Sequence, residues 1–408
     1  MESLSSADSP RARRFIDGAR LKCIRCGAQH EGEPKLFACP KCSGLLEVVL
    51  EKLEWRPRGR GVWRYASALP APPIPPVTMG EGGTPLVRSR ESGSLYFKLE
   101  GLNPTGSFKD RGVSVATTVA LYSGAKCLVC ASTGNTSASV AAYAARAGMR
   151  AAVVLPRGKV ARGKLLQALG YGARVVWVDG SFDEAIKLVR EVVSMSGDLY
   201  PMNSFNPWRL EGQKTVVFEI FEELGRVDAV VYPVGNGGNI SAGWKAAEEL
   251  MTMGLIDDPP RLIGVQAAGA APIADAFERG LSEPVFYDKP ETVATAIRIG
   301  RPVNWPKVFR AIAKSGGAVL KVSDEEILRA QRELARREGI LVEPASASTY
   351  AGYQRALETG VLDRDEVVVL VLTGNALKDP SSIELMSSEE IQLTRGATAR
   401  ELLEALLR

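Results

Sequence analysis

Short runs rich in β-branched residues alternate with helical segments along most of this chain, and that alternation limits the folds it can adopt. The pattern predicts strands at 95–100, 126–131, 151–155, 174–178, 229–234, 262–266 and 367–372, and helices most clearly at 136–147, 182–195, 207–224, 239–250 and 324–338. A βαβα order predicts an α/β fold whose parallel sheets carry helices on both faces. Ligands of such folds bind at the carboxyl ends of the strands, so candidate functional residues belong there.

Composition narrows the possible functions. With 45% hydrophobic and 24% charged residues among 408, the chain is globular, and 51 basic against 47 acidic residues leave +4, too little to indicate a nucleic-acid or membrane partner. No apolar run reaches the ~18 residues that span a bilayer, and the first twenty residues lack a signal-peptide core. We therefore expect a cytoplasmic protein. Its single histidine, His30, leaves little room for a Ser-His-Asp triad or a histidine-rich catalytic metal site.

Two Cys-x-x-Cys pairs near the N-terminus are spaced like the ligands of a zinc ribbon. Cys23 and Cys26 are followed, after twelve residues, by Cys39 and Cys42. Four thiolates leave no open position on the metal, so the expected site is structural zinc. A pair of disulfides is the alternative, although disulfides are rare in cytosolic chains. His30 lies inside the ribbon, and we expect it at the surface.

A third pair, Cys127 and Cys130, has the same spacing but lies within an apolar strand. Positions three apart in a strand face opposite sides of the sheet. We therefore expect two buried core thiols and no metal site there.

The first of three polar loops that follow expected strands is NPTGSFKDRG at 103–112. It turns at Asn-Pro-Thr-Gly and opens a helix, with Ser107 as the expected cap and Lys109 in the first turn. The positive end of a helix disfavours a cation, so this position, with burial, would lower the pKa of Lys109 from about 10.4 and make its amine a better nucleophile. A solvated lysine beside Asp110 and Arg111 is the alternative from this loop alone.

The other two loops suit anions. ASTGNTSASV at 131–140 surrounds Asn135 with the hydroxyls of Ser132, Thr133, Thr136 and Ser137. Free amides at a helix start bind anions such as a carboxylate, although a well-capped helix has the same composition. VGNGGNISAG at 234–243 has the composition of a phosphate cradle but matches neither the dinucleotide nor the Walker fingerprint, which favours a phosphate other than NAD or ATP. A tight strand-to-helix turn is the alternative.

A further expected strand ends at Thr373, which places a hydroxyl at the carboxyl edge of the sheet. A lysine, a phosphate cradle, a polar loop and a lone hydroxyl together predict a pyridoxal phosphate site. They would supply the Schiff base, the phosphate clamp, a partner for the ring phenolate and a partner for the pyridine nitrogen. Each feature alone is compatible with other functions, whereas all four together in this order along the chain indicate a pyridoxal phosphate site.

Longer motifs carry a resemblance to a known family. They are GGTPL at 82–86, NPTGSFKDRG, STGNTSAS, NSFNPWRLEGQKT at 203–215, GNGGN, ATAIRIG at 294–300, EPASAS at 343–348 and LTGNALKDP at 372–380. Over residues 78–382 the chain resembles the threonine synthases, a family of fold type II pyridoxal phosphate enzymes, and its ribbon resembles the N-terminal extension of some members. The resemblance implies two parallel-sheet α/β domains of the tryptophan synthase β-like architecture, preceded by the small zinc ribbon. The implied layout is a flexible arm at 1–20, the ribbon at 21–50, a large domain at 51–100 and 200–385, a small domain at 101–199 and a helical tail at 386–408.

The resemblance also implies a role for each matching residue. Lys109 is expected to hold the cofactor as a Schiff base, with Phe108 packed beside it. Asn135 should contact the phenolate oxygen of the ring, and Thr373 its pyridine nitrogen. The expected cofactor-phosphate residues are Gly235, Asn236, Gly237, Gly238 and Asn239, and the expected substrate-binding residues are Ser132, Thr133, Thr136, Asn203, Ser204 and Arg209. For Arg209 alone, a surface ion pair with Glu211 or Glu219 is the alternative.

The implied reaction converts O-phospho-L-homoserine and water into L-threonine and phosphate, in a homodimer without a catalytic metal. Many relatives carry histidine at Asn375 and asparagine at Arg301, so both positions depart from the family pattern. The nearest alternatives are a cysteate synthase using O-phosphoserine and sulfite, and a threonine dehydratase, which usually has histidine at Thr136 and does not need the phosphate-binding Arg209. An alternative from another class is a non-catalytic zinc-ribbon adaptor, which the near-neutral charge and the intact lysine loop disfavour.

Overall fold

A six-stranded sheet forms the larger half of the structure, a computed structural model that describes residues 15–132, 134–157, 165–180, 182–384, 386 and 400. Its strands, in the spatial order β12-β11-β10-β13-β5-β4, are β4 (Leu86–Arg88), β5 (Leu95–Leu99), β10 (Ala229–Pro233), β11 (Arg261–Ala267), β12 (Ala318–Val322) and β13 (Val368–Leu372). Neighbouring strands are parallel except for the β4–β5 pair, which is antiparallel. The α/β class is confirmed, and the antiparallel edge strand is an addition to the expected parallel sheet.

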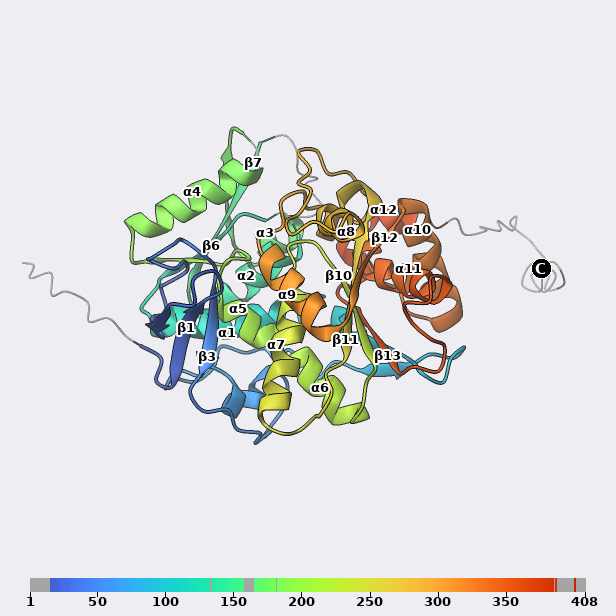
Figure 1. Cartoon of the computed structure of the whole chain (residues 1–408). Coiled ribbons are helices and arrows are strands. Elements are labelled where there is room, and N and C mark those ends of the chain that lie inside the picture. Colours follow the sequence, from blue (N-terminus) through green and yellow to red (C-terminus); the bar gives the residue numbers. More distant parts are fainter. Residues whose placement is uncertain are drawn as a thin grey trace, which may run out of the picture.

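A second sheet of four parallel strands lies beside it (Figure 1). In the order β8-β7-β6-β9 its strands are β6 (Cys127–Cys130), β7 (Arg150–Pro156), β8 (Arg174–Val178) and β9 (Leu199–Pro201). Cys127 and Cys130 are both buried and belong to core clusters on opposite faces of this sheet. The expectation of two core thiols is therefore confirmed. Strand β9 extends just past the boundary expected at residue 199.

Helices pack on both faces of the two sheets (Figure 1). They are α1 (Lys109–Tyr122), α2 (Asn135–Arg146), α3 (Leu166–Gly170), α4 (Phe182–Met195), α5 (Trp208–Gln213), α6 (Thr215–Leu224), α7 (Gly238–Thr252), α8 (Pro272–Glu278), α9 (Trp305–Ser315), α10 (Asp324–Glu333), α11 (Pro344–Glu358) and α12 (Ser381–Glu384). The helix expected at 207–224 is interrupted at Lys214, where the Thr215 hydroxyl donates to the Gly212 carbonyl at 2.7 Å. The helix expected at 324–338 ends at 333 and continues as a π turn.

The cysteine-rich segment folds as a small antiparallel sheet, ordered β2-β1-β3. Its strands are β1 (Ala19–Cys23), β2 (Gln29–Glu31) and β3 (Leu46–Leu50). Strand β1 begins inside the arm expected at 1–20, and Ile16 is buried, so that boundary is wrong. The reason is that Ile16 and Ala19 enter the ribbon core, although two such residues are too few to form an apolar period in the sequence. Residues 1–14 lie outside the described residues.

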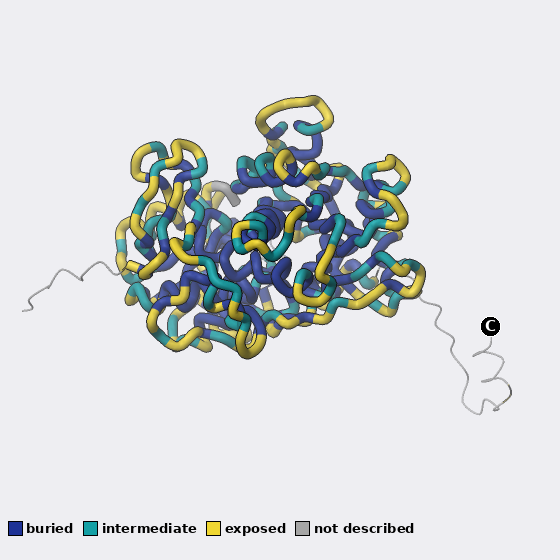
Figure 2. Tube along the Cα trace, turned by 60° about the horizontal axis from the view of Figure 1, so that its bottom comes forward, coloured by how far each residue is buried: buried dark blue, intermediate teal, exposed yellow. Residues whose placement is uncertain are grey.

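The core explains why the central strands are apolar along their whole length. All five residues of β10 and all five of β13 are buried, because separate clusters of apolar side chains cover the two faces of the large sheet. Figure 2 shows this buried interior, with exposed positions gathered at loops and turns. Most of the helical tail expected at 386–408 lies outside the described residues. No helix among the described residues is long and apolar enough to cross a membrane.

Candidate active site

A cavity opens where loops from both sheets meet. It lies at the carboxyl ends of β10 and β13, as expected for ligands of parallel sheets. The predicted residues that line it are Phe108, Lys109, Asn135, Ser204, Arg209, Gly235, Asn236, Gly237, Gly238, Asn239 and Thr373. Residues distant in sequence are therefore brought together into one candidate site.

Lys109 is the first residue of α1 and is held at the cavity wall by its neighbours. The backbone N–H of Phe108 donates to the Thr373 carbonyl at 3.0 Å, and the Lys109 Nζ lies 4.2 Å from the centroid of the Phe108 ring. Burial, reinforced by the nearby charge of Arg209, lowers the pKa of Lys109 to about 7. A substantial fraction of the free amine is then neutral near pH 7, which a nucleophile or base requires.

The alternative of a solvated lysine beside Asp110 and Arg111 is wrong, because both neighbours are fully buried and bonded elsewhere. The Asp110 carboxylate accepts from the N–H and the hydroxyl of Thr105, both at 2.7 Å. The expected cap at Ser107 is also wrong, since α1 has no side-chain cap and the Ser107 hydroxyl finds no partner among the described residues. Asp110, which lies in the first turn of α1, instead stabilises the turn that precedes the helix.

Glu343 is a functional candidate to which the sequence analysis assigned no role. It precedes α11, is 4% exposed and lines the cavity, and its Oε1 accepts from the Asn135 Nδ2 at 2.9 Å. Burial raises the pKa of Glu343 to about 7, against the opposing influence of Lys378 and the bond from Asn135. The Asn135 amide has a second N–H, which remains available for a ligand. The signal for Glu343 was its place in the EPASAS motif, where a carboxylate begins a run of small residues.

Thr373 directly follows β13, and its hydroxyl is held by a serine from α11. The Ser346 Oγ lies 3.0 Å from the Thr373 Oγ1 and accepts from the Gly374 N–H at 2.8 Å. Both hydroxyls are buried. A neutral hydroxyl fixed in this way suits an uncharged ring nitrogen, and Ser346 is a second residue to which no role had been assigned.

The glycine loop leads into α7 and fits a phosphate. Gly237 has φ +79°, and a Cβ there would lie 2.4 Å from the Val308 Cγ2, so the backbone passes too close to α9 for any side chain. The side-chain oxygen and nitrogen of Asn239 are buried without a hydrogen-bond partner among the described residues. Helix-start amides and an unpartnered amide side chain facing one cavity match the requirements of a bound anion.

Arg209 supplies a second anion-binding group on the same cavity. It is 4% exposed, its NH1 donates to the Met202 carbonyl at 2.9 Å, and its Nε has no partner among the described residues. Burial lowers the pKa of Arg209 to about 10, which still leaves the guanidinium charged at neutral pH. The surface-pair alternative is wrong, because Glu211 binds Lys214 and Glu219 binds Arg111.

The comparison with known proteins agrees with this geometry. Residues 77–374 match the family described as "Pyridoxal-phosphate dependent enzyme". The chain is 49% identical over 390 residues to the threonine synthase of Methanocaldococcus jannaschii, covering 91% of this chain and 96% of that protein. It is 48% identical over 380 residues to the threonine synthase of Methanosarcina acetivorans, covering 89% and 93%. The chain belongs to the threonine synthase family of pyridoxal-phosphate-dependent enzymes.

Solved structures show that this chain has the fold type II architecture. The threonine synthase of Escherichia coli superposes with a TM-score of 0.71 at 22% identity, covering 92% of this chain and 93% of that one. The maize serine racemase superposes with a TM-score of 0.63, also at 22% identity, covering 80% and 94%. Because identity to both is low, these likenesses concern the fold, whereas the family rests on the sequence relatives.

Three of the described residues expected to bind substrate are not part of the cavity lining. Asn203 is buried and uses its amide to pair with the backbone of Ala131, accepting at 3.1 Å and donating at 3.0 Å, so it joins the two loops. Ser132 and Thr136 are half-buried outside the lining, and Thr133 lies outside the described residues.

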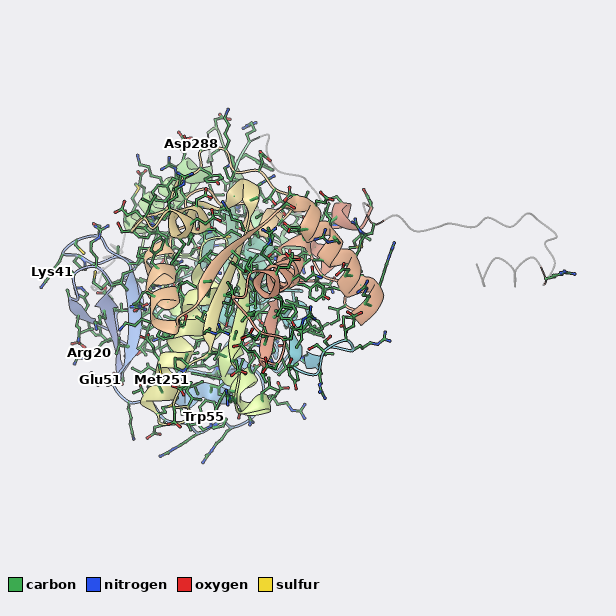
Figure 3. All side chains as sticks on the ribbon, turned by 45° about the vertical axis from the view of Figure 1, so that its right-hand side comes forward. Arg20, Lys41, Glu51, Trp55, Met251 and Asp288 are labelled. Atoms are coloured by element: carbon green, nitrogen blue, oxygen red, sulfur yellow. The ribbon has the colours of Figure 1, made fainter. Side chains whose placement is uncertain are left out.

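The two departures from the family pattern lie away from the cavity wall. Arg301 forms an ion pair with Asp288 at 2.7 Å, and Asp288 lies at the periphery of the molecule (Figure 3). Asn375 accepts from the Leu377 N–H at 2.9 Å and so caps a short 3-10 turn. Neither side chain contributes to the lining of the described cavity.

The four ribbon cysteines fit a zinc ion. Their sulfur atoms lie within 4.8 Å of one another, with 3.5 Å between the Sγ atoms of Cys23 and Cys42 and 3.7 Å between those of Cys26 and Cys39. Tetrahedral zinc with bonds of about 2.3 Å to sulfur requires sulfur separations of about 3.8 Å. His30 is partly exposed, in keeping with the expected surface position, and its Nε2 lies 3.5 Å from the Cys39 Sγ, the position of a group that hydrogen-bonds a ligand.

Proposed function

We propose that this enzyme binds pyridoxal phosphate through Lys109 and converts O-phospho-L-homoserine and water into L-threonine and phosphate. The observation that carries the proposal is that two separate anion sites, the glycine loop and Arg209, face one cavity that also holds a reactive lysine. The loop takes the phosphate of the cofactor. The Arg209 guanidinium on the same cavity suits a second phosphate, such as the one that O-phosphohomoserine carries.

The cofactor supplies, when bound, an electron sink that makes the bonds at the substrate α carbon acidic. Lys109 removes the α proton and then moves a proton at the β carbon, which allows phosphate to leave from the γ carbon. Its Nζ is suited to both transfers because a pKa of about 7 lets the amine accept and return protons near neutral pH. Reprotonation at the γ carbon, addition of water at the β carbon and return of a proton to the α carbon complete the reaction.

We assign the remaining residues by their position. Asn135 offers its free N–H to the phenolate oxygen, Thr373 contacts the pyridine nitrogen, and Phe108 supports Lys109. Arg209 and Ser204 bind the substrate phosphate, in keeping with their place on the cavity wall. From the family resemblance alone, we assign the substrate carboxylate or its phosphate to Ser132, Thr133 and Thr136, and we give Asn203 a positioning role.

The assembly and cellular setting belong to the same proposal. We propose a cytoplasmic homodimer that carries one structural zinc ion per chain on Cys23, Cys26, Cys39 and Cys42. The domain layout proposed is a large domain at 51–100 and 200–385 and a small domain at 101–199. The separate six- and four-stranded sheets support this division.

A product assay tests the function directly. The purified protein is incubated with pyridoxal phosphate and O-phosphohomoserine, and in a parallel reaction with O-phosphoserine and sulfite, while phosphate and amino acids are measured. We expect equal amounts of phosphate and threonine from the first reaction. Cysteate from the second reaction instead would identify the phosphoserine enzyme. Release of 2-oxobutanoate from threonine would identify the dehydratase. The lack of a cofactor absorbance band would support the non-catalytic adaptor.

A further inference from the structure

Polar contacts, several of them buried, join the zinc ribbon to helix α9. Lys307 is 2% exposed, and its Nζ donates to the Leu46 carbonyl of β3 at 2.9 Å and lies 3.9 Å from the Glu47 carboxylate. Arg310, one turn further along α9, donates to the same carboxylate at 2.9 Å. Figure 3 shows the ribbon strands running alongside this helix. In the β1–β3 ladder, Leu46 is the residue paired with Cys23. The contact with α9 therefore begins at the strand partner of an expected zinc ligand.

The first residues of α9 touch both phosphate-binding loops. The Asn304 N–H donates to the Asn236 carbonyl at 3.0 Å, and the Asn304 Nδ2 donates to the Ser204 carbonyl at 3.0 Å. One turn into the helix, Val308 packs directly against Gly237. Helix α9 is therefore the wall against which the glycine loop and the loop at 203–209 both rest.

A second set of contacts connects the ribbon to the Arg209 loop. The Trp208 indole N–H donates to the Pro34 carbonyl at 3.1 Å. The Phe37 ring packs edge-on against Tyr200 at 5.1 Å between centroids and against Phe205 at 6.4 Å. The ribbon thus contacts the residue directly before Arg209 and the loop that leads to it.

We propose that Lys307 is a positioning residue through which the ribbon sets the two phosphate-binding loops, so that the ribbon and its metal control the affinity for the phosphate groups of cofactor and substrate. The inference rests on the proposed function, because it takes these loops to bind the two phosphates. Hydrogen-bond donors stabilise a bound phosphate only when they match its oxygens closely, and a shift of about 1 Å loses most of that match. Losing the Lys307 ammonium would leave the Leu46 carbonyl and the Glu47 carboxylate without this donor, and α9 would move to compensate.

A matched pair of variants tests the proposal. Lys307→Met removes the donor, and Lys314→Met is the control, because Lys314 is exposed on the same helix. Dissociation constants for pyridoxal phosphate are measured by absorbance titration of the apoprotein, and KM and kcat are measured for O-phosphohomoserine. We expect Lys307→Met to raise the dissociation constant and KM about tenfold, while kcat at saturation changes less than about twofold. Lys307→Arg should restore most of the affinity, because it returns a donor to the Leu46 carbonyl.

The proposal is overturned if Lys307→Met and Lys314→Met bind pyridoxal phosphate with the same dissociation constant and share the same KM. If Lys307→Met does not fold, as judged by circular dichroism, Glu47→Gln tests the same contact with a smaller change, and the same comparison with Lys314→Met decides. A failure of the proposed function is distinguishable, because the wild-type protein would then bind the cofactor without consuming O-phosphohomoserine. The cofactor titration of the two variants could still be carried out in that case.

Metal release from the full-length holoenzyme tests the zinc part. Zinc is released by a thiol reagent with a chromogenic chelator, and the cofactor is followed by its absorbance. We expect cofactor affinity to fall about tenfold as zinc leaves, and Cys127→Ser with Cys130→Ser excludes reaction at those thiols as the cause. Complete zinc release with unchanged cofactor affinity would show that the ribbon metal has no such control.

Discussion

At the scale of single residues, Lys109 and Glu343 are the two cavity groups with the largest consequences for chemistry. Burial lowers the pKa of the amine and raises that of the carboxyl, so both lie at about 7. Near neutral pH each group is therefore divided between its charged and uncharged forms. That is the condition under which a lysine can act alternately as base and acid.

The Glu343 carboxyl should make the free energy of unfolding depend on pH. The pKa of Glu343 rises from 4.5 unfolded to about 7 folded, so the folded state binds the additional proton and its free energy of unfolding falls as pH rises through this window. Glu343→Gln should remove a fall of about 3 kcal/mol between pH 4.5 and 7. Urea unfolding of the apoprotein across this range measures it, with Glu358→Gln as a control because Glu358 is exposed on the following helix. Identical pH profiles for wild type and Glu343→Gln would mean that Glu343 titrates normally.

The Lys109 amine should make stability depend on pH in the opposite direction. The pKa of Lys109 falls from 10.5 unfolded to about 7 folded, so the unfolded state binds more protons and stability of the apoprotein rises between pH 7 and 10.5. Lys109→Met should flatten this rise in the same urea experiments. A rise that survives the substitution would have to come from another group.

The Arg209 assignment predicts a loss that is specific to phosphorylated substrate. Arg209→Gln should raise KM for O-phosphohomoserine by about 10- to 100-fold, the range expected when a hydrogen bond to a charged group is lost. Cofactor affinity should change much less, because the glycine loop is intact. Arg226→Gln is the control, as its side chain is 86% exposed. Unchanged kinetics in Arg209→Gln would remove Arg209 from the substrate site.

At the scale of secondary-structure elements, the way in which each strand or helix is buried determined whether it could be predicted from the sequence. The strands β10, β11 and β13 were predicted because continuous apolar runs are required when helices cover both faces of a sheet. Strand β4 is exposed or half-buried, and β9 is only three residues long, so neither carries such a run. Helix α11 is buried on almost every side, which removes the amphipathic period that marks a helix in the sequence.

The close approach of α9 to the glycine loop predicts a binding defect without general unfolding. Gly237→Ala places a Cβ in contact with Val308, whereas Gly254→Ala, at φ +67°, meets nothing within 4 Å. Both substitutions should cost about 1 kcal/mol of stability because of the positive φ, and Gly237→Ala should cost more because its Cβ would lie 2.4 Å from the Val308 Cγ2. Only Gly237→Ala should weaken pyridoxal phosphate binding, by about tenfold or more in a titration. Equal affinities for the two variants would contradict the assignment of this loop to the phosphate.

At the scale of the whole molecule, the site depends on contacts that join distant parts of the chain. Asn135 and Glu343 are hydrogen-bonded although 208 residues separate them, and Ser346 reaches Thr373 from another element. The loops could be predicted from the sequence, because loops that follow parallel strands share one edge of a sheet. The roles of Glu343 and Ser346 could not, because helix packing, and not local pattern, brings these residues to the cavity.

A buried arginine anchors the lysine-bearing helix to the large sheet, and its loss should be costly. Arg111 on α1 binds Glu100 at 2.7 Å and Glu219 at 2.6 Å, and all three side chains are buried. Arg111→Met would leave the buried Glu100 carboxylate without its cation and would remove one of the two cations of Glu219, which keeps Lys98 at 2.9 Å. The free energy of unfolding should therefore fall by about 3–5 kcal/mol. Arg88→Met, at an exposed position, should change it by less than about 0.5 kcal/mol. Urea denaturation compares the two, and similar values would show that the network is not an anchor.

Covalent trapping of the cofactor tests the central claim most directly. The holoenzyme is reduced with borohydride, digested and mapped by mass spectrometry, with Lys109→Ala treated in the same way. The account predicts one pyridoxyl label, on Lys109, and neither label nor turnover in Lys109→Ala. A label on a different lysine, or a wild-type protein that takes up no label, would contradict it.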